Sequence, residues 1–307
     1  MNRRETLGLL GLGAAGLTLP VAAQDRAPER LVDFAAPSTL IDPPRVTVWL
    51  PEGYDAGKRR YGVLYMADGQ NLFDPKNAYL GRIWGVDRAL TRLAAAGTID
   101  PVIVVGIWNA GKDRFRQYMP AAPTDRIAGV RAGIEKAIGG PILSDAWLDF
   151  LVHELKPRID RDYRTRPGFA HTAIAGSSMG GLISLYAIDR FPKVFSRAAC
   201  VSTHWPVLLP EGDAAPKMQA EITAMWTGWL KATLGAPAGR RIWFDHGDQT
   251  LDRFYAPYQA AVDRTLADLG WREGRDVVSR TYPGAAHDEP SWAKRLDAVL
   301  GWTLATS

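Results

Sequence analysis

One stretch, residues 172 to 187, most narrows what this chain can fold into. It is an apolar run that enters the pattern Gly-x-Ser-x-Gly and leaves it with amphipathic spacing. This order is typical of a strand, a sharp turn and a helix. The small residues Gly176 and Gly180 leave room for a strained central serine that exposes its hydroxyl oxygen. The pattern therefore predicts that Ser178 is a nucleophile, although a chain with 30 glycines can also contain it by chance.

Two backbone amides are candidates for holding a developing negative charge. The Met179 amide would enter the same space from the first turn of the helix, where unpaired N–H groups and the helix dipole favour an anion. A second donor is expected from the loop after an early strand. Asp68-Gly69-Gln70 fits this position, because Gly69 would let the backbone approach the substrate and free the Gln70 amide. The alternative for these three residues is an ordinary turn.

The first 23 residues have the pattern of a Tat-type export signal. A twin-arginine sequence at residues 3–7 precedes an apolar stretch at 9–19 and a small-residue cleavage site at 21–23. The apolar stretch is short for a membrane span. A Gly-x-Gly-x-x-Gly at 11–16 follows no strand, which excludes a dinucleotide site there. We expect the mature protein in a periplasm or outside the cell.

The composition of the whole chain is that of a globular α/β protein. The chain has 307 residues, 47% hydrophobic and 23% charged, which fits one larger domain or two small ones. A net charge of +4 with scattered Lys and Arg gives no sign of a nucleic-acid surface. We expect a lead-in at residues 24–44 and a single domain at 45–304. The one cysteine, Cys200, is expected to be a buried small hydrophobe.

Strands alternate with helices along this domain. Besides the strand before Ser178, strands are expected at residues 45–50, 61–66, 102–107, 198–202, 241–247 and 277–282. Other helices are expected at 84–96, 145–159, 221–234, 251–269 and 292–304. The stretch from 108 to 144 reads as irregular and is a candidate cleft-covering insertion. The alternation predicts a doubly wound, mostly parallel sheet with ligands at the carboxyl ends of its strands, where Ser178 lies.

A serine hydroxyl needs a base, which in this chain order should be a late histidine that follows an acid. His287 lies in a Gly-Pro loop between the last strand and the last helix, and it is the predicted base. The other four histidines fit less well: His153 is in a helix, His171 is at the wrong end of the sheet, His204 precedes any plausible acid, and His246 is a candidate core residue.

The acid should follow the strand that ends at Gly247. Asp245 is expected to lie within that strand. Asp248 and Asp252 both come after it, although Asp248 could be a turn residue and Asp252 a helix N-cap. Position alone leaves these two nearly equal.

Several motifs together resemble the esterase family that includes esterase D, enterochelin esterases and feruloyl esterases. They lie at residues 66–73, 84–87, 104–107, 150–155, 163–165, 176–181 and 283–287. The resemblance implies an α/β-hydrolase fold without a large separate cap, and no metal or organic cofactor. S-formylglutathione hydrolases in this family carry their acid in Gly-x-x-Asp-x-Phe. Residues 251–254 are similar but lie two positions further on, so the resemblance favours Asp252 over Asp248.

The sequence thus predicts a secreted serine esterase that forms an acyl-enzyme on a small-molecule or polymer-borne ester. Carbohydrate, aromatic-acid and siderophore-type esters are the expected substrate classes. Trp205 and Trp84 follow strand-end loops and are candidates for an aromatic binding surface, with plain core as the alternative. An acyltransferase could use the same residues. A non-catalytic binding protein is less favoured, because all three residue types of a triad occur in hydrolase order.

Overall fold

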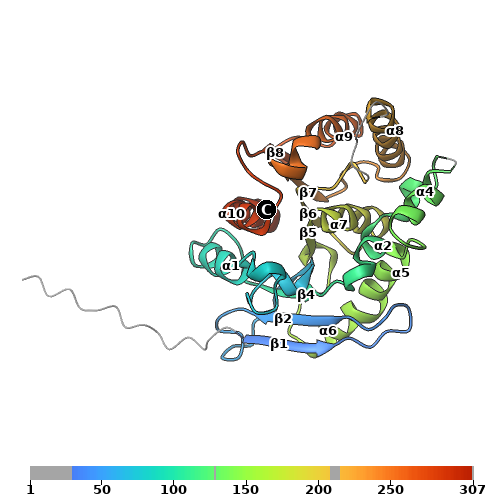
Figure 1. The fold of residues 1–307 in the computed structure, drawn as a ribbon. Coiled ribbons are helices and arrows are strands. Elements are labelled where there is room, and N and C mark those ends of the chain that lie inside the picture. The colour runs from blue at the N-terminus through green and yellow to red at the C-terminus, as the bar shows by residue number, and fades with distance from the viewer. Residues whose placement is uncertain (1–29, 128, 208–214, 306–307) are drawn as a thin grey trace, which may run out of the picture.

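The computed structural model describes residues 30–127, 129–207 and 215–305, which form one eight-stranded sheet with helices on both faces (Figure 1). The strands are β1 (Arg30–Ala35), β2 (Arg45–Leu50), β3 (Gly62–Ala67), β4 (Val102–Ile107), β5 (Thr172–Ser177), β6 (Arg197–Val201), β7 (Arg241–His246) and β8 (Val277–Thr281). Their order across the sheet is β1-β2-β4-β3-β5-β6-β7-β8. Only β1–β2 and β2–β4 are antiparallel among these described pairs. The predicted mostly parallel, doubly wound sheet is confirmed, while the predicted signal at residues 1–23 lies outside the described residues.

Helices cover the sheet from two sides. The longer ones are α1 (Val86–Ala95), α7 (Met179–Arg190), α8 (Ala215–Thr233), α9 (Ala256–Asp268) and α10 (Glu289–Leu304). In Figure 1, α1 and α10 lie on one side of the sheet, and α7 lies on the other with α2 (Arg114–Tyr118) and α5 (Ser144–Asp149). Within the described ranges, no helix combines the length and the apolar character needed to cross a membrane.

Alternate side chains of the central strands enter two separate hydrophobic cores. On β3, Val63 and Tyr65 pack into the core beneath α7, and Leu64 and Met66 pack into the core beneath α1 and α10. The β4 strand is buried along its whole length. Strands with two covered faces are expected to be continuous apolar runs, and the run at Val102–Ile107 shows this pattern.

The sheet extends beyond the residue at which the sequence predicts the domain to begin. β1 lies within the expected lead-in at 24–44 and pairs with β2 from Arg30 opposite Leu50 to Ala35 opposite Arg45. Its side chains are exposed or half-buried. An edge strand with so little apolar burial has a weak sequence signal.

In two of the expected helices the type of helix changes near a proline. The segment expected at 251–269 is a 3₁₀ turn, η6 (Thr250–Phe254), followed by α9, which has Pro257 in its first turn. The segment expected at 145–159 is α5, a π-helical stretch (Phe150–Leu155) and α6 (Lys156–Asp162), with Pro157 in the first turn of α6. Proline fits the first turn of a helix and interrupts the hydrogen bonds of a continuing one.

The stretch at 108–144 is more ordered than its sequence indicates. It contains α2, α3 (Ala121–Thr124) and α4 (Val130–Ala137), and α2 packs against α5 and α7. These helices are too short to show a convincing helical period.

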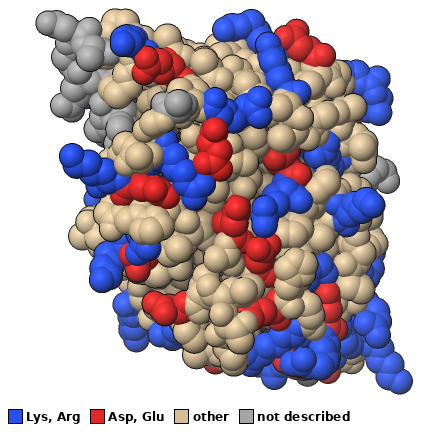
Figure 2. All heavy atoms as spheres, turned by 90° about the vertical axis from the view of Figure 1, so that its right-hand side faces the viewer, with Lys and Arg blue, Asp and Glu red and all other residues tan. Residues whose placement is uncertain are grey.

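On the described part of the face in Figure 2, basic and acidic side chains are interspersed. Arg131, for example, pairs with both Asp125 and Glu135.

A contact between two glycines places the loop after β3 directly over β4. A Cβ added to Gly69 would lie 2.5 Å from the carbonyl oxygen of Gly106, and one added to Gly106 would lie 2.9 Å from Leu72 Cδ1. The sequence assigned Gly69 to substrate approach. The structure shows that Gly69 also makes this backbone contact, which fixes the 3₁₀ turn η1 (Gly69–Asn71) at the end of the sheet.

We predict that Gly69→Ala lowers the free energy of unfolding by about 1–3 kcal/mol, because the new methyl group overlaps the backbone of β4. Gly228→Ala in α8 is the matched control, since its Cβ would meet nothing closer than 3.7 Å. Alanine in place of a helical glycine should leave stability unchanged or raise it by about 0.5–1 kcal/mol. Urea denaturation of both variants measures the difference, and equal stabilities would contradict the packing argument.

Candidate active site

Ser178 occupies a strained turn between β5 and α7. Its backbone angles are φ 58° and ψ −122°, a conformation that non-glycine residues rarely adopt. Its N–H donates to the carbonyl of Val201 at 2.9 Å, and its carbonyl accepts from the N–H of His204 at 3.2 Å. These bonds to the loop after β6 hold the turn, and the residue is 9% exposed.

The two flanking glycines are required by close packing within this turn. A Cβ on Gly176 would lie 2.7 Å from the carbonyl oxygen of Gly180, and a Cβ on Gly180 would lie 3.2 Å from the Cβ of Ala67. The contact at Gly176 is too short for a side chain, and the contact between Gly180 and β3 is tighter than ordinary packing. The Gly-x-Ser-x-Gly pattern therefore reports a chain reversal in which the strand end and the helix start touch, with Ser178 at its tip.

His287 and Asp252 meet at the same edge of the sheet. His287 Nδ1 lies 2.6 Å from Asp252 Oδ1, and the Asp252 side chain is fully buried. The other carboxylate oxygen accepts from Ser202 Oγ at 2.7 Å and from the N–H of Gly247 at 2.6 Å. Burial raises the pKa of Asp252, but the hydrogen bonds from His287, Ser202 and Gly247 outweigh it, so the pKa is below its usual value.

Asp248 lies apart from this pair. Its exposed carboxylate accepts from Gln249 Nε2 at 2.9 Å and from the N–H of Gly284 at 2.8 Å. The pKa of Asp248 is lowered mainly by these two hydrogen bonds. Of the two carboxylates that position alone left equal, the structure brings Asp252 to His287 and uses Asp248 to tie the loop after β7 to the loop after β8.

These two loops are joined by backbone contacts as well. The N–H groups of Asp248 and Gln249 both donate to the carbonyl of Ala285, at 3.2 and 3.0 Å. A Cβ on Gly247 would overlap that same carbonyl. The N–H of His287 donates to Thr250 Oγ1 at 2.8 Å. The loop that carries Asp252 and the loop that carries His287 are therefore fastened together on either side of the side-chain pair.

A buried polar network holds the Asp252 side chain in place. Ser202 Oγ donates to the aspartate and accepts from Trp292 Nε1 at 3.0 Å and from Arg295 Nη2 at 2.7 Å. The same Arg295 nitrogen lies 2.7 Å from Asp245 Oδ1, and both side chains are almost wholly buried. Sequence reasoning missed this network because its hydrogen-bonded pairs are 50 to 93 positions apart and belong to no motif.

The two predicted oxyanion donors lie in the first turns of neighbouring helices. Met179 is the first residue of α7, so its N–H has no acceptor within the helix. In η1 the first internal hydrogen bond runs from the Asn71 N–H to the Asp68 carbonyl, and the N–H of Gln70 precedes it. The turns are adjacent, because a Cβ on Gly180 would lie 3.6 Å from Asp68 Oδ2.

Asp68 is the anchor of the η1 turn. Its backbone is left-handed, with φ 57° and ψ 46°. Its carboxylate accepts two hydrogen bonds from Arg114, both at 2.7 Å, and one from Asn109 Nδ2 at 2.7 Å. The Gln70 side chain turns toward the same segment and accepts from the N–H of Asn109 at 3.3 Å. The insertion after β4 thus fixes the position of the Gln70 amide.

Both candidate substrate tryptophans are buried. Trp205 is 1% exposed, donates from Nε1 to Gln259 Oε1 at 2.9 Å, and packs edge-on against Trp226. Trp84 is 5% exposed and lies 5.4 Å from the ring of Trp292, which in turn stands edge-on to His287 at 5.1 Å. Both rings occupy the core positions that the sequence left open as the alternative.

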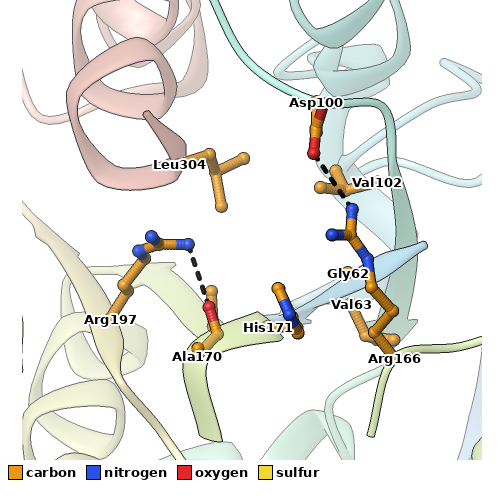
Figure 3. Close-up of a pocket in the computed structure, with 10 residues that line it drawn as sticks. Gly62, Val63, Asp100, Val102, Arg166, Ala170, His171, Arg197 and Leu304 are labelled. Atoms are coloured by element: carbon orange, nitrogen blue, oxygen red, sulfur yellow. Dashed lines mark hydrogen bonds and ion pairs between the residues drawn. The ribbon is translucent and has the colours of Figure 1, made fainter. Parts of the chain in front are cut away.

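The remaining histidines lie in other settings. His171 lines a cavity of about 230 Å³ at the amino ends of the strands, between Arg166 and Arg197 (Figure 3), so it is at the far edge, as expected. The ring of His246 is buried, with Nδ1 2.6 Å from the carbonyl of Gly247, and that of His153 stacks edge-on against Phe191. In the described ranges, no three His, Cys, Asp or Glu residues form a group able to hold a metal ion.

The fold and this strand-edge arrangement define the class of protein as an α/β hydrolase, and the described residues include no large separate cap. The family model described as "Putative esterase" matches residues 38–303. The chain therefore belongs to this esterase family and is a carboxylic ester hydrolase, as its motifs predicted.

Known proteins similar to this chain cover most of its length. A curated relative, the uncharacterized protein YbbA of Bacillus subtilis (strain 168), is 22% identical over 260 residues, which are 84% of this chain and 91% of the relative. A ferulic acid esterase structure has a TM-score of 0.64 at 20% identity and covers 90% of this chain and 98% of its own. An IroE-like serine hydrolase from Shewanella oneidensis has a TM-score of 0.61 at 20% identity and covers 88% and 79%. The structural likenesses show a shared fold.

We predict that Asp252→Asn lowers kcat by roughly 10³–10⁴-fold, because an amide no longer fixes the imidazole tautomer or stabilises its cation. Asp248→Asn, the control, should change kcat by less than about threefold, because asparagine keeps the Oδ1 atom that accepts from the N–H of Gly284 and loses only an exposed charge. Initial rates on an activated short-chain ester measure both variants. A larger loss at Asp248 than at Asp252 would contradict the assignment.

Proposed function

We propose that this ester hydrolase works through a serine acyl-enzyme, with Ser178 as nucleophile, His287 as base and Asp252 as the group that orients the base. The proposal is carried by the 2.6 Å contact between His287 Nδ1 and buried Asp252. It is supported by a common neighbour: the Tyr255 hydroxyl lies 3.4 Å from His287 Nδ1, and the nearby Ser178 side chain lowers the pKa of the same hydroxyl.

The reaction follows from the direction in which His287 faces. Because Nδ1 faces Asp252, Nε2 is the nitrogen that takes the proton of Ser178 as its oxygen attacks the ester carbonyl. The imidazolium then donates this proton to the departing alcohol, which leaves an acyl group on Ser178. Water repeats the sequence and releases the acid. The buried carboxylate of Asp252 stabilises the imidazolium in both halves of the cycle.

The negative charge on the tetrahedral intermediate is assigned to the N–H groups of Met179 and Gln70. Both precede the first internal hydrogen bond of a helical turn, and the dipole of α7 favours an anion at Met179. These donors are backbone atoms, held in place by the Gly176–Gly180 and Gly69–Gly106 contacts. They need no rearrangement when charge develops, which is the condition for effective electrostatic stabilisation.

We assign the substrate to the carbohydrate, aromatic-acid or siderophore-type esters, and the protein to the periplasm or the outside of the cell. The name of one similar structure, a ferulic acid esterase, supports the aromatic-acid class, and the twin-arginine pattern at residues 3–7 supports export. Turnover measured over these ester classes, with alcohol acceptor varied, identifies the substrate. It also separates hydrolysis from acyl transfer, because a transferase forms mainly new ester at low acceptor concentration, whereas a hydrolase releases mainly the free acid.

We predict that Ser178→Ala and His287→Ala each reduce kcat by roughly 10⁴–10⁶-fold, and that the double variant is no worse than either one. Members of a triad act as a unit, so removing a second member costs nothing more. Steady-state rates on p-nitrophenyl acetate, with urea denaturation to verify folding, provide the measurement. Losses that multiply in the double variant would show that the two residues act independently.

A further inference from the structure

A buried tyrosine and a buried histidine lie next to the proposed catalytic residues. The Tyr255 hydroxyl lies 2.7 Å from His204 Nδ1 and 3.4 Å from His287 Nδ1, and the nearby Ser178 side chain lowers the pKa of this hydroxyl. The Tyr255 ring is fully buried and stands edge-on to both imidazoles. One phenol oxygen thus has three polar neighbours.

The hydrogen bonds among Tyr255, His204 and His287 determine which atom carries each proton. The 2.6 Å contact between His287 Nδ1 and a carboxylate needs a proton on that nitrogen, so Tyr255 cannot donate to it. Burial raises the pKa of Tyr255, which keeps its proton. Burial, together with the nearby His287 and Arg114, lowers the pKa of His204 to about 4. A neutral His204 offers Nδ1 as the acceptor for the phenol proton.

We propose that Tyr255, oriented by His204, is a positioning residue for His287, with its phenol oxygen as a second acceptor for the Nδ1–H of the imidazolium. This inference rests on the proposed function. With its proton directed to His204, the phenol presents only lone pairs to His287 and Ser178. If the proton turned the other way, it would point at the N–H that it has to stabilise.

The second acceptor matters most when His287 is charged. In the resting state the Nδ1–H bonds mainly to Asp252, and the 3.4 Å contact to Tyr255 is weak. When His287 takes the serine proton, its positive charge strengthens every bond that this N–H makes in a water-poor site. The ring is also held between Tyr255 and Trp292, which stand edge-on to it at 89° and 84°. The contact between the Tyr255 oxygen and His287 Nδ1 therefore stabilises the charged histidine during the chemical step.

Tyr255→Phe removes only the phenol oxygen. We expect it to lower kcat about tenfold, the loss of one hydrogen bond to a charged group, with KM changed less than about twofold. The matched control is Tyr258→Phe, one turn along the same segment, because the buried Tyr258 hydroxyl has no hydrogen-bond partner in the described part of the chain. Tyr258→Phe should retain the wild-type kcat.

His204 variants test whether this residue acts through Tyr255. His204→Leu should lose about as much kcat as Tyr255→Phe, and the double variant should lose no more than Tyr255→Phe alone. His204→Asn should restore most of the activity, because its side-chain amide places a polar atom near the position of Nδ1. A residue that only supports the fold would instead change KM and thermal stability, with no rescue by asparagine.

The outcomes separate this inference from the proposed function. A wild-type enzyme that neither turns over esters nor reacts with a fluorophosphonate at Ser178 would overturn both. If the wild type does both, the inference is overturned by a Tyr255→Phe enzyme with unchanged kcat, or by losses at Tyr255 and His204 that multiply. A tenfold kcat loss with asparagine rescue, in proteins of wild-type stability, supports it.

Discussion

The backbone of Ser178 is the constraint around which the rest of this edge is built. Its positive φ is stabilised only because Gly176 and Gly180 touch and because the loop after β6 bonds to it on both sides. The backbones of Asp68, Ser202 and Thr250 are also left-handed, and each follows one of the strands whose ends meet there. Such strain persists where surrounding packing over-determines it, and it clusters at functional sites.

The geometry of the base depends on fastening two loops that are far apart in the sequence. The carbonyl of Ala285 accepts from two consecutive N–H groups of the loop after β7, and Asp248 bonds back to Gly284. Asp252 and His287 are thereby placed on rigid backbone, and the network through Ser202 and Arg295 prevents the buried carboxylate from turning. The acid is held from three directions before any substrate arrives.

The sequence predicts those parts of the site that depend on neighbouring residues, and it does not predict the parts that depend on contacts between distant segments. The strand, turn and helix around Ser178 and the loop with His287 are local patterns, so they could be placed without a structure. Chain position alone left Asp252 and Asp248 equal, and only the family resemblance favoured Asp252, because its place depends on η6, a turn set by tertiary contacts ahead of a proline. Tyr255 and His204 had no local signal, since their roles arise only where segments about 50 residues apart meet. The burial of Trp205 has the same origin.

The central claim is that Ser178 attacks while the Met179 and Gln70 amides hold the oxyanion. A crystal structure of the enzyme inactivated by a fluorophosphonate tests it most directly, because the phosphonyl oxygen occupies the place of the oxyanion. We expect a covalent bond to Ser178 Oγ, with that oxygen within about 3.1 Å of both backbone nitrogens. An adduct on another residue, or an oxygen directed away from both amides, would contradict it.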